Sequence, residues 1–164
     1  MRFSMPSERT EISGRKHVTH LLLDAPIDLV WQVWIEPDHI RHWWGPDGFK
    51  SKIEKMEVTP GGDWIFTMHG PDGKVYPNKT IFREVVPMEK LVQEHFAPNF
   101  MATIQFEQRG KQTHVTWYKI YESDELYDLI ERQYNAAEGF RQTIKRLINY
   151  LNECMYNFNR HERP

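Results

Sequence analysis

The stretch that decides the fold is AAEGFRQTIKRLINYLNECM, residues 136–155. Its apolar side chains recur at spacings of mostly three and four residues, which places them along one stripe of an α-helix. They are Ala137, Phe140, Ile144, Leu147, Ile148, Leu151 and Met155. Polar and basic side chains fill the opposite face. The pattern predicts one long amphipathic helix, whose apolar stripe has to pack against another element.

Residues 49–121, which precede this helix, alternate between apolar and polar side chains in segments that are preceded and separated by turn motifs. The turns are rich in the glycine and proline typical of tight reversals. They are Gly45-Pro46-Asp47-Gly48, Pro60-Gly61-Gly62, Gly70-Pro71-Asp72-Gly73 and Arg109-Gly110-Lys111. Strands joined by such short turns pair antiparallel. We therefore expect about six strands here, after a first strand near residues 16–23.

Three positions predict local features of these elements. The apolar phase slips at Glu54-Lys55, which indicates a β-bulge. Pro77 lacks the backbone N–H that a central strand needs, so it has to lie at an edge or a bulge. Ser123 is the expected N-cap of the helical region that follows the last strand.

Two short helices are expected between the first strand and the others. Ile27, Val30, Trp31 and Trp34 recur at helical spacing, and Pro37 starts a second helical segment. The order predicts an α+β fold, a curved antiparallel sheet of about six to seven strands around the long C-terminal helix. That helix is the only element we expect to cover the sheet. We expect a flexible arm over 1–14, one domain over 15–158 and a tail over 159–164.

Composition excludes several classes of function. The chain of 164 residues has a formal net charge of −2 and scattered basic residues, which gives no footprint for nucleic acid. The single cysteine, Cys154, allows no internal disulfide. The N-terminal residues lack the apolar run of a signal peptide, and no stretch is long and apolar enough to span a bilayer. We expect a cytoplasmic protein.

Several motifs, taken together and in order, resemble one group of proteins. They include Asp24-Ala25-Pro26, Trp43-Trp44-Gly45-Pro46, Pro60-Gly61-Gly62-Asp63-Trp64, Glu84-Val85-Val86-Pro87, Val115-Thr116-Trp117 and Ala136-Ala137-Glu138-Gly139. Over about residues 16–151 the chain is similar to bacterial SRPBCC proteins of the START-like superfamily that resemble the C-terminal domain of the activator of Hsp90 ATPase. The resemblance implies a helix-grip fold with a cavity between the long helix and the sheet. The superfamily includes lipid carriers, hormone-binding proteins, cyclases and co-chaperone domains, so the fold does not assign a function.

Two departures from this group bear on function. The eukaryotic activator carries an additional N-terminal domain, for which we expect no room in this chain. Lys119 stands in the inward-facing series of its strand, where the group more often has an apolar residue. Either the strand is bulged there, or a cation lies near the cavity.

The candidate cavity is lined by the inward faces of the strands and by the helix. We expect its walls to contain Trp64, Phe66, Met68, His69, Tyr76, Asn78, Thr80, His95, Phe106, Trp117, Tyr121, Tyr134 and Glu138. Mostly apolar walls with a few polar groups suit a small-molecule site. The alternative is that these rings fill the interior themselves and leave no cavity, because both arrangements give the same alternation. At Gly139 the missing side chain either makes room for a ligand or allows a sheet tryptophan to approach the helix closely.

Three residues keep an enzymatic alternative open. Glu138, His69 or His95 could act as an acid or base in a cyclase-like or hydrolytic reaction, provided that they converge on one cavity. The alternative for Glu138 is a solvated ion pair with Arg141. His39 and His42 have a spacing that can bind a metal, but no third ligand is evident, so we expect no metal and no cofactor.

The interpretation we favour is a non-enzymatic binder of a small apolar or amphipathic molecule, acting as a monomer or homodimer. A chaperone-associated interaction module is the second interpretation, and it is implied by the family resemblance alone. The cyclase-like or hydrolytic enzyme is the third. Neither nucleic acid nor a membrane is an expected partner.

Overall fold

The computed structural model describes residues 7–161. Eight strands form one antiparallel sheet in the order β1-β2-β8-β7-β6-β5-β4-β3. The strands are β1 (Ser7–Ser13), β2 (Lys16–Leu23), β3 (Lys50–Met56), β4 (Asp63–His69), β5 (Val75–Val86), β6 (Lys90–Phe96), β7 (Phe100–Arg109) and β8 (Gln112–Tyr121). The helices are α1 (Ile27–Ile35), α2 (Pro37–Ile40), α3 (Asp124–Tyr134) and α4 (Ala136–His161). The α+β class and the antiparallel sheet are confirmed, with eight strands instead of six to seven.

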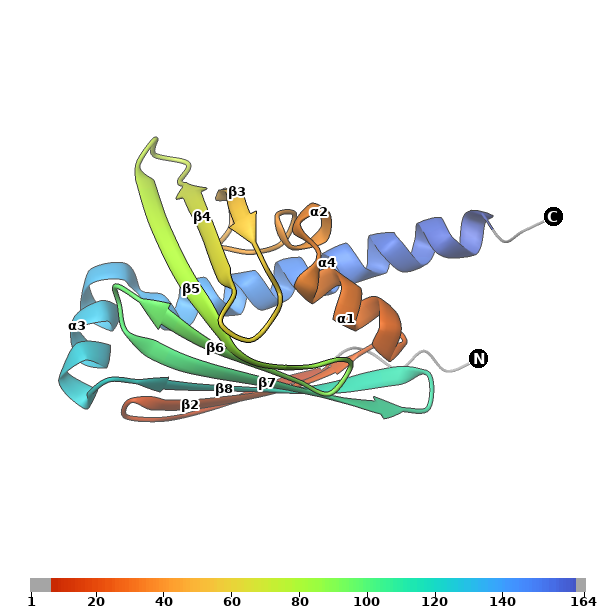
Figure 1. Ribbon diagram of the computed structural model, residues 1–164, viewed down its shortest axis with the longest axis horizontal. Coiled ribbons are helices and arrows are strands. Elements are labelled where there is room, and N and C mark those ends of the chain that lie inside the picture. The colour runs from red at the N-terminus through yellow and green to blue at the C-terminus, as the bar shows by residue number, and fades with distance from the viewer. Residues whose placement is uncertain (1–6, 162–164) are drawn as a thin grey trace.

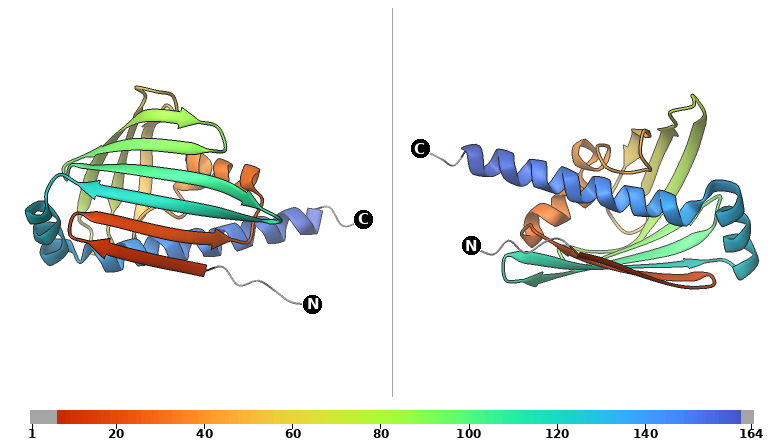
Figure 2. Two further views of the ribbon diagram at one scale, coloured as in Figure 1. Left: turned by 90° about the horizontal axis from the view of Figure 1, so that it is seen from below. Right: turned by 180° about the vertical axis from the view of Figure 1, so that it is seen from behind.

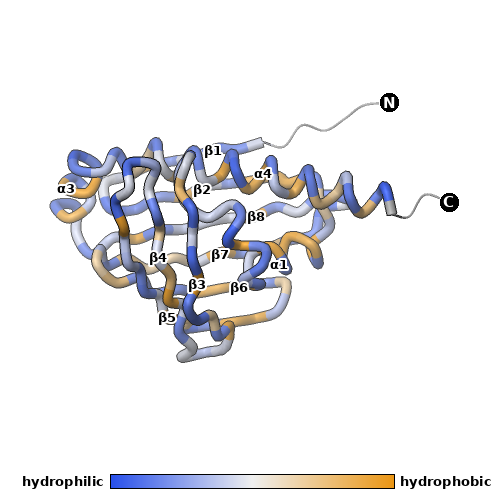
Figure 3. Tube along the Cα trace, turned by 90° about the horizontal axis from the view of Figure 1, so that it is seen from above, coloured by the Kyte–Doolittle hydropathy of each residue, from blue (hydrophilic) through white to orange (hydrophobic). Residues whose placement is uncertain are grey.

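The sheet curves around α4, which crosses its concave side (Figure 1). The predicted long helix is therefore confirmed, and Figure 3 shows apolar and polar positions alternating along it. Its C-terminal end projects past the sheet (Figure 2), and residues 159–161 are helical instead of forming a tail. Residues 162–164 lie outside the described part of the chain. No helix described between residues 7 and 161 has both the length and the apolar character needed to cross a membrane.

The strand β1 corrects the expected N-terminal arm. Residues 7–13 pair with β2 from Ser7↔Leu22 to Ser13↔Lys16, through a turn in which Gly14 has a φ of 54°. All seven side chains of β1 are exposed. Backbone hydrogen bonds to β2 hold this edge strand, so it has no buried face that the hydrophobic pattern could reveal. The rest of the expected arm, residues 1–6, is not described.

The three local predictions are confirmed. The pairing of β3 with β4 shifts register between Ile53 and Lys55, which is the predicted bulge. Pro77 pairs with Thr67 of β4, whereas β6 joins β5 only from Lys79 onward, so Pro77 has a neighbour on one side. Ser123 caps α3, since its hydroxyl accepts a hydrogen bond of 3.0 Å from the Leu126 amide.

Helices α1 and α4 lie side by side over the concave face (Figure 3), which corrects the expectation that α4 covers it alone. At the α1 end of the interior, opposite α3 (Figure 1), Trp34 of α1 and Trp43 of the segment after α2 are both fully buried. The Trp34 ring lies 5.5 Å from Phe106 and 5.0 Å from Trp117, measured between ring centroids. Aromatic rings therefore fill this end of the interior. The other end, beneath α3 and the start of α4, is the end that contains the pocket.

Candidate functional site

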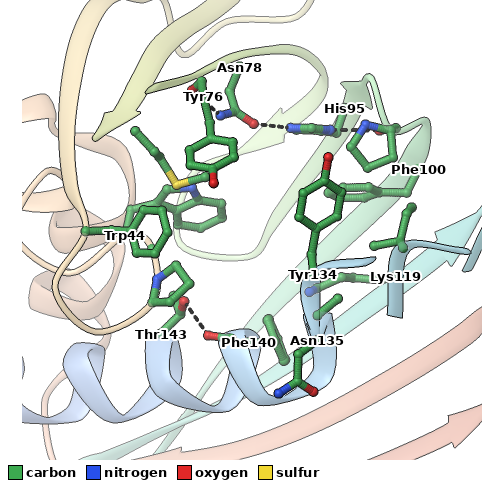
Figure 4. Close-up of a pocket in the computed structure, with 18 of the residues that line it drawn as sticks. Trp44, Tyr76, Asn78, His95, Phe100, Lys119, Tyr134, Asn135, Phe140 and Thr143 are labelled. Carbon is green, nitrogen blue, oxygen red and sulfur yellow. Dashed lines mark hydrogen bonds between the residues drawn. The ribbon is translucent and has the colours of Figure 1, made fainter. Parts of the chain in front are cut away.

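A pocket of about 720 Å³ lies between the concave face of β4–β8 and the junction of α3 and α4 (Figure 4). Strand alternation supplies one wall, because Tyr76, Asn78 and Thr80 share the inward face of β5. The first turns of α4 supply the facing wall, through Phe140 and Thr143. The pocket therefore lies where helices cover strands β4–β8 but their side chains do not fill the space between helix and sheet.

Nine of the thirteen predicted residues line this pocket. They are Met68, Tyr76, Asn78, Thr80, His95, Trp117, Tyr121, Tyr134 and Glu138. Tyr134 lies at the mouth, where its side chain is 58% exposed, and its ring points toward the strands that carry Asn78 and His95 (Figure 4).

The other four predicted residues lie elsewhere. Trp64, Phe66 and Phe106 are buried in the main core, where the rings of Trp64 and Phe66 stack at 4.4 Å. Their positions face inward as predicted, but the rings of α1 and the α2–β3 segment pack onto them and leave no space. His69 is exposed at the end of β4 and takes no part in the pocket. Inward orientation alone thus does not separate core from pocket wall.

Several pocket residues were missed by the sequence prediction. Gln93 and Ala102 could have been predicted from the sequence. Gln93 lies on the same face of β6 as Leu91 and His95, and Ala102 lies on the same face of β7 as Ile104. Trp44 and Pro46 come from the segment after α2, which reaches the pocket only through tertiary packing. No pattern local to residues 44–46 indicates that contact.

His95 is held by two partners inside the pocket. Its Nδ1 lies 2.8 Å from the Pro98 carbonyl oxygen and its Nε2 lies 2.9 Å from Asn78 Oδ1 (Figure 4). Both oxygens are acceptors, so the neutral ring donates to one of them at a time. Asn78 is itself fixed, since its Nδ2 donates to the Tyr76 carbonyl at 2.9 Å. Burial lowers the pKa of His95, and the bond to Pro98 opposes that shift. With both ring nitrogens occupied, His95 is placed as a fixed polar contact and not as a free proton carrier.

Lys119 is a cation in the pocket wall, and the strand is not bulged there. It pairs in regular register with His17 of β2 and Ala102 of β7. Its Nζ lies 3.3 Å from the ring centroid of Phe140, a cation–π arrangement with α4. Burial of the ammonium group lowers the pKa of Lys119 to about 7. Of the two interpretations of Lys119, a bulged strand or a cation near the cavity, the structure has the cation.

Glu138 forms the ion pair that was the alternative to a catalytic role. The Arg141 guanidinium donates two hydrogen bonds to its carboxylate, of 2.8 and 2.6 Å. This pairing lowers the pKa of Glu138, whereas a general acid needs a raised one. Glu138 and His95 thus line one pocket and His69 lies outside it, but both lining residues already have partners, Arg141 for Glu138 and the Pro98 and Asn78 oxygens for His95.

Comparison with known proteins identifies the family of this chain. Residues 24–152 match the family described as activator of Hsp90 ATPase homolog 1-like protein, and this match covers well over half of the sequence. The chain belongs to that family. The resemblance drawn from its tryptophan, glycine and proline motifs is thereby confirmed. No curated protein matches the sequence.

Solved structures of bacterial proteins share the fold of this family member. A protein from Arthrobacter aurescens has a TM-score of 0.82 at 23% identity, with 90% of this chain and 91% of that chain covered. One from Nitrosomonas europaea has a TM-score of 0.77 at 22% identity, covering 89% and 99%. A protein titled AHSA1-like, from Aeromonas hydrophila, has a TM-score of 0.64 at 16% identity, covering 79% and 91%. At these identities the likeness concerns the fold.

In this activator-like chain, Arg146 of α4 fixes the segment that forms one pocket wall. Its guanidinium donates to the carbonyls of Gly45 at 2.7 Å, Pro46 at 3.0 Å and His42 at 3.1 Å. Pro46 in turn lies against Gly139, where an added Cβ would come within 3.3 Å of the proline ring. The close approach at Gly139 therefore involves Pro46, and the expected tryptophan is not the neighbour. Arg146 was not predicted, because its spacing marks it only as a polar-face residue.

The histidine pair that raised the question of a metal has other partners. His39 Nδ1 lies 2.7 Å from the Tyr150 hydroxyl, and the His42 ring stacks on Tyr150 with centroids 5.4 Å apart. Across residues 7–161 there is no group of three or more His, Cys, Asp or Glu side chains arranged to hold a metal ion. These histidines serve to pack α2 and the following turn onto α4.

Proposed function

We propose that this protein binds a small apolar or amphipathic molecule in the pocket between the sheet and the α3–α4 junction. The observation that supports the proposal is the pocket itself, about 720 Å³ in volume. Ligand sites in proteins commonly span roughly 300–1,000 Å³ and combine apolar walls with a few fixed polar groups. Aromatic side chains such as Trp117 and Phe140 supply the apolar surface, and the His95–Asn78 pair supplies fixed polarity.

Tyr134 provides the first test of this proposal, because it lies at the pocket mouth and its removal leaves the core intact. Replacing Tyr134 with alanine removes a ring that would cover the ligand, and we expect the affinity for the neutral apolar dye N-phenyl-1-naphthylamine to fall about tenfold. Fluorescence titration measures the affinity. Native mass spectrometry of freshly purified protein, run in parallel, is expected to show a retained small molecule.

Leu129→Ala is the matched control. Leu129 lies on the same helix and is similarly exposed at 52%, but it does not line the pocket. Its replacement is expected to leave dye affinity unchanged. Absence of dye binding in the wild-type protein, together with the absence of any retained molecule, would contradict the proposal. Equal losses in the two variants would place the binding outside the pocket.

A second candidate function follows from the family match over residues 24–152. The family is described by its likeness to an activator of the Hsp90 ATPase, which favours a chaperone-associated interaction module. Steady-state ATP hydrolysis by the Hsp90 of the same organism, measured with and without this protein, tests that function. A rate increase that saturates with added protein would support it, and an unchanged rate with no binding in a pull-down would remove it.

A further inference from the structure

One row of side chains across the sheet forms part of the pocket floor. Gln93 of β6 pairs with Ala102 of β7, and Ala102 pairs with Lys119 of β8. Neighbouring strands lie about 4.8 Å apart, so the backbones of Gln93 and Lys119 are separated by roughly 10 Å with Ala102 between them. The adjacent inward positions of β7 are occupied by Phe100 and Ile104. The small Ala102 side chain therefore leaves a recess between an amide and an ammonium group.

Two residues of the pocket lining carry a hydrogen-bond donor that has no acceptor among the described residues. Gln93 is only 4% exposed, and within residues 7–161 its Nε2 has no hydrogen-bond partner. The Nε1 of the neighbouring Trp117, also buried, likewise has none among the described residues. Buried polar atoms are paired in the great majority of cases, because an unpaired donor loses its hydration without compensation. Trp34 and Trp64 in the closed core also have unpaired indole nitrogens, so it is the place of Gln93 in the pocket lining that links its free donor to a ligand.

Charge in the pocket points in the same direction. Lys119 contacts the faces of Phe140 and Trp117, at 3.3 and 5.7 Å from Nζ to the ring centroids, and forms no ion pair within the described chain. The one carboxylate in the pocket lining, that of Glu138, is already engaged by Arg141. Arg132 adds a second cation to the rim. Among the described lining residues, Lys119 and the free donor of Gln93 therefore face no carboxylate that is not already paired.

We propose that the recess over Ala102 is an anion subsite, and that the ligand is an amphipathic acid whose carboxylate binds between Lys119 and Gln93. The apolar body of the acid lies against the rings of Trp117, Phe140 and Tyr134. This inference rests on the proposed function and specifies the chemical class of its ligand. A carboxylate accepts several hydrogen bonds at once, so it satisfies the ammonium group and the Gln93 amide together.

Protonation of Lys119 is coupled to binding in this arrangement. Burial lowers the pKa of Lys119 to about 7, and a carboxylate bound beside it favours the charged ammonium. Acid binding near pH 8 is therefore expected to take up a proton. Other groups facing Lys119 do not titrate there: burial lowers the pKa of His17 on β2 to about 4 and also lowers that of His95 on β6, while burial raises the pKa of Tyr121 on β8 to about 12. The carboxylate of Glu138 on α4, held by Arg141, and the guanidinium of Arg132 on α3 are the remaining charges.

The test compares two probes of nearly equal shape, 2-naphthoate and its neutral amide 2-naphthamide. Both are titrated near pH 7.5 as competitors of N-phenyl-1-naphthylamine. Lys119→Met keeps an unbranched apolar chain and removes the charge, and it is expected to weaken 2-naphthoate at least tenfold while changing 2-naphthamide less than about threefold. Gln93→Leu is expected to weaken 2-naphthoate at least about tenfold, in line with the loss of one hydrogen bond to a charged group.

Calorimetry near pH 8, in two buffers of different ionisation enthalpy, gives an independent readout. Proton uptake with 2-naphthoate is expected in the wild-type protein and absent in Lys119→Met. If the dye and 2-naphthamide bind but 2-naphthoate binds no better and is insensitive to Lys119→Met, the anion subsite is overturned and the binding function stands. If neither the dye nor either naphthyl compound binds, the proposed function itself fails.

Discussion

Replacing Trp34 with alanine is expected to lower the free energy of unfolding by about 3–5 kcal/mol, the range for removing a large aromatic side chain from a packed core. Trp34 is fully buried, with 0% of its surface exposed. Its ring packs edge-to-face on Trp43, Phe106 and Trp117, at centroid distances of 5.0, 5.5 and 5.0 Å. These neighbours come from three different elements and cannot all close on the vacated space, so a cavity remains.

Urea denaturation followed by far-UV circular dichroism measures the loss. Tyr156→Ala is the control, since Tyr156 is an aromatic residue on α4 that is 65% exposed, and exposed sites of this kind change stability by about 0.5 kcal/mol or less. Because Trp117 lies between Trp34 and the pocket, the Trp34 variant is also expected to bind the apolar dye more weakly. A loss of stability below about 1 kcal/mol would contradict the placement of Trp34 at the centre of the core.

The parts of this fold that were predictable are those encoded by local periodicity. The stripe containing Phe140, Leu147 and Leu151 marks α4 because spacing along one helix depends only on neighbouring residues. The bulge between Ile53 and Lys55 was visible for the same reason, as a slip in alternation. Strand β1 was not visible, because all its side chains are exposed at the sheet edge and no apolar alternation marks it.

The pocket was only partly predictable, because alternation gives the face of a residue and not its neighbours. Trp64 and Tyr76 both face inward, yet Trp64 lies under Trp44 at 4.9 Å and Tyr76 borders open space. The difference depends on where α1 and the segment after α2 pack. The row that joins Gln93, Ala102 and Lys119 likewise depends on the register of three strands, which is a long-range property.

Lys119→Met is expected to have the second large effect, an increase in stability of about 3 kcal/mol near pH 7. Lowering the pKa of Lys119 from 10.5 to about 7 corresponds to a cost of at most about 5 kcal/mol for the charged form in the folded protein, at about 1.4 kcal/mol for each pH unit. The cation–π contact with Phe140 offsets about 1–2 kcal/mol of that cost. Methionine fills the same space without a charge.

The pH dependence of this gain separates the charge from simple repacking. Between pH 7 and pH 10.5 the unfolded wild-type chain keeps the Lys119 proton and the folded chain releases it, so the stability of the wild type rises with pH over this window. Below pH 7 both states are protonated and the full cost applies. The advantage of Lys119→Met is therefore expected to shrink by about 2 kcal/mol between pH 7 and pH 9, as measured by urea denaturation at each pH.

Lys119→Leu, which also removes the charge but changes the shape, is the control for packing. It is expected to show the same pH trend on top of a smaller gain. A constant difference between wild type and Lys119→Met across pH 7–9 would show that the ammonium group is well solvated in the folded protein. A destabilising residue is tolerated where function requires it. If Lys119→Met gains stability and loses affinity for the acid together, the cost of burying this cation is explained by the anion that it binds.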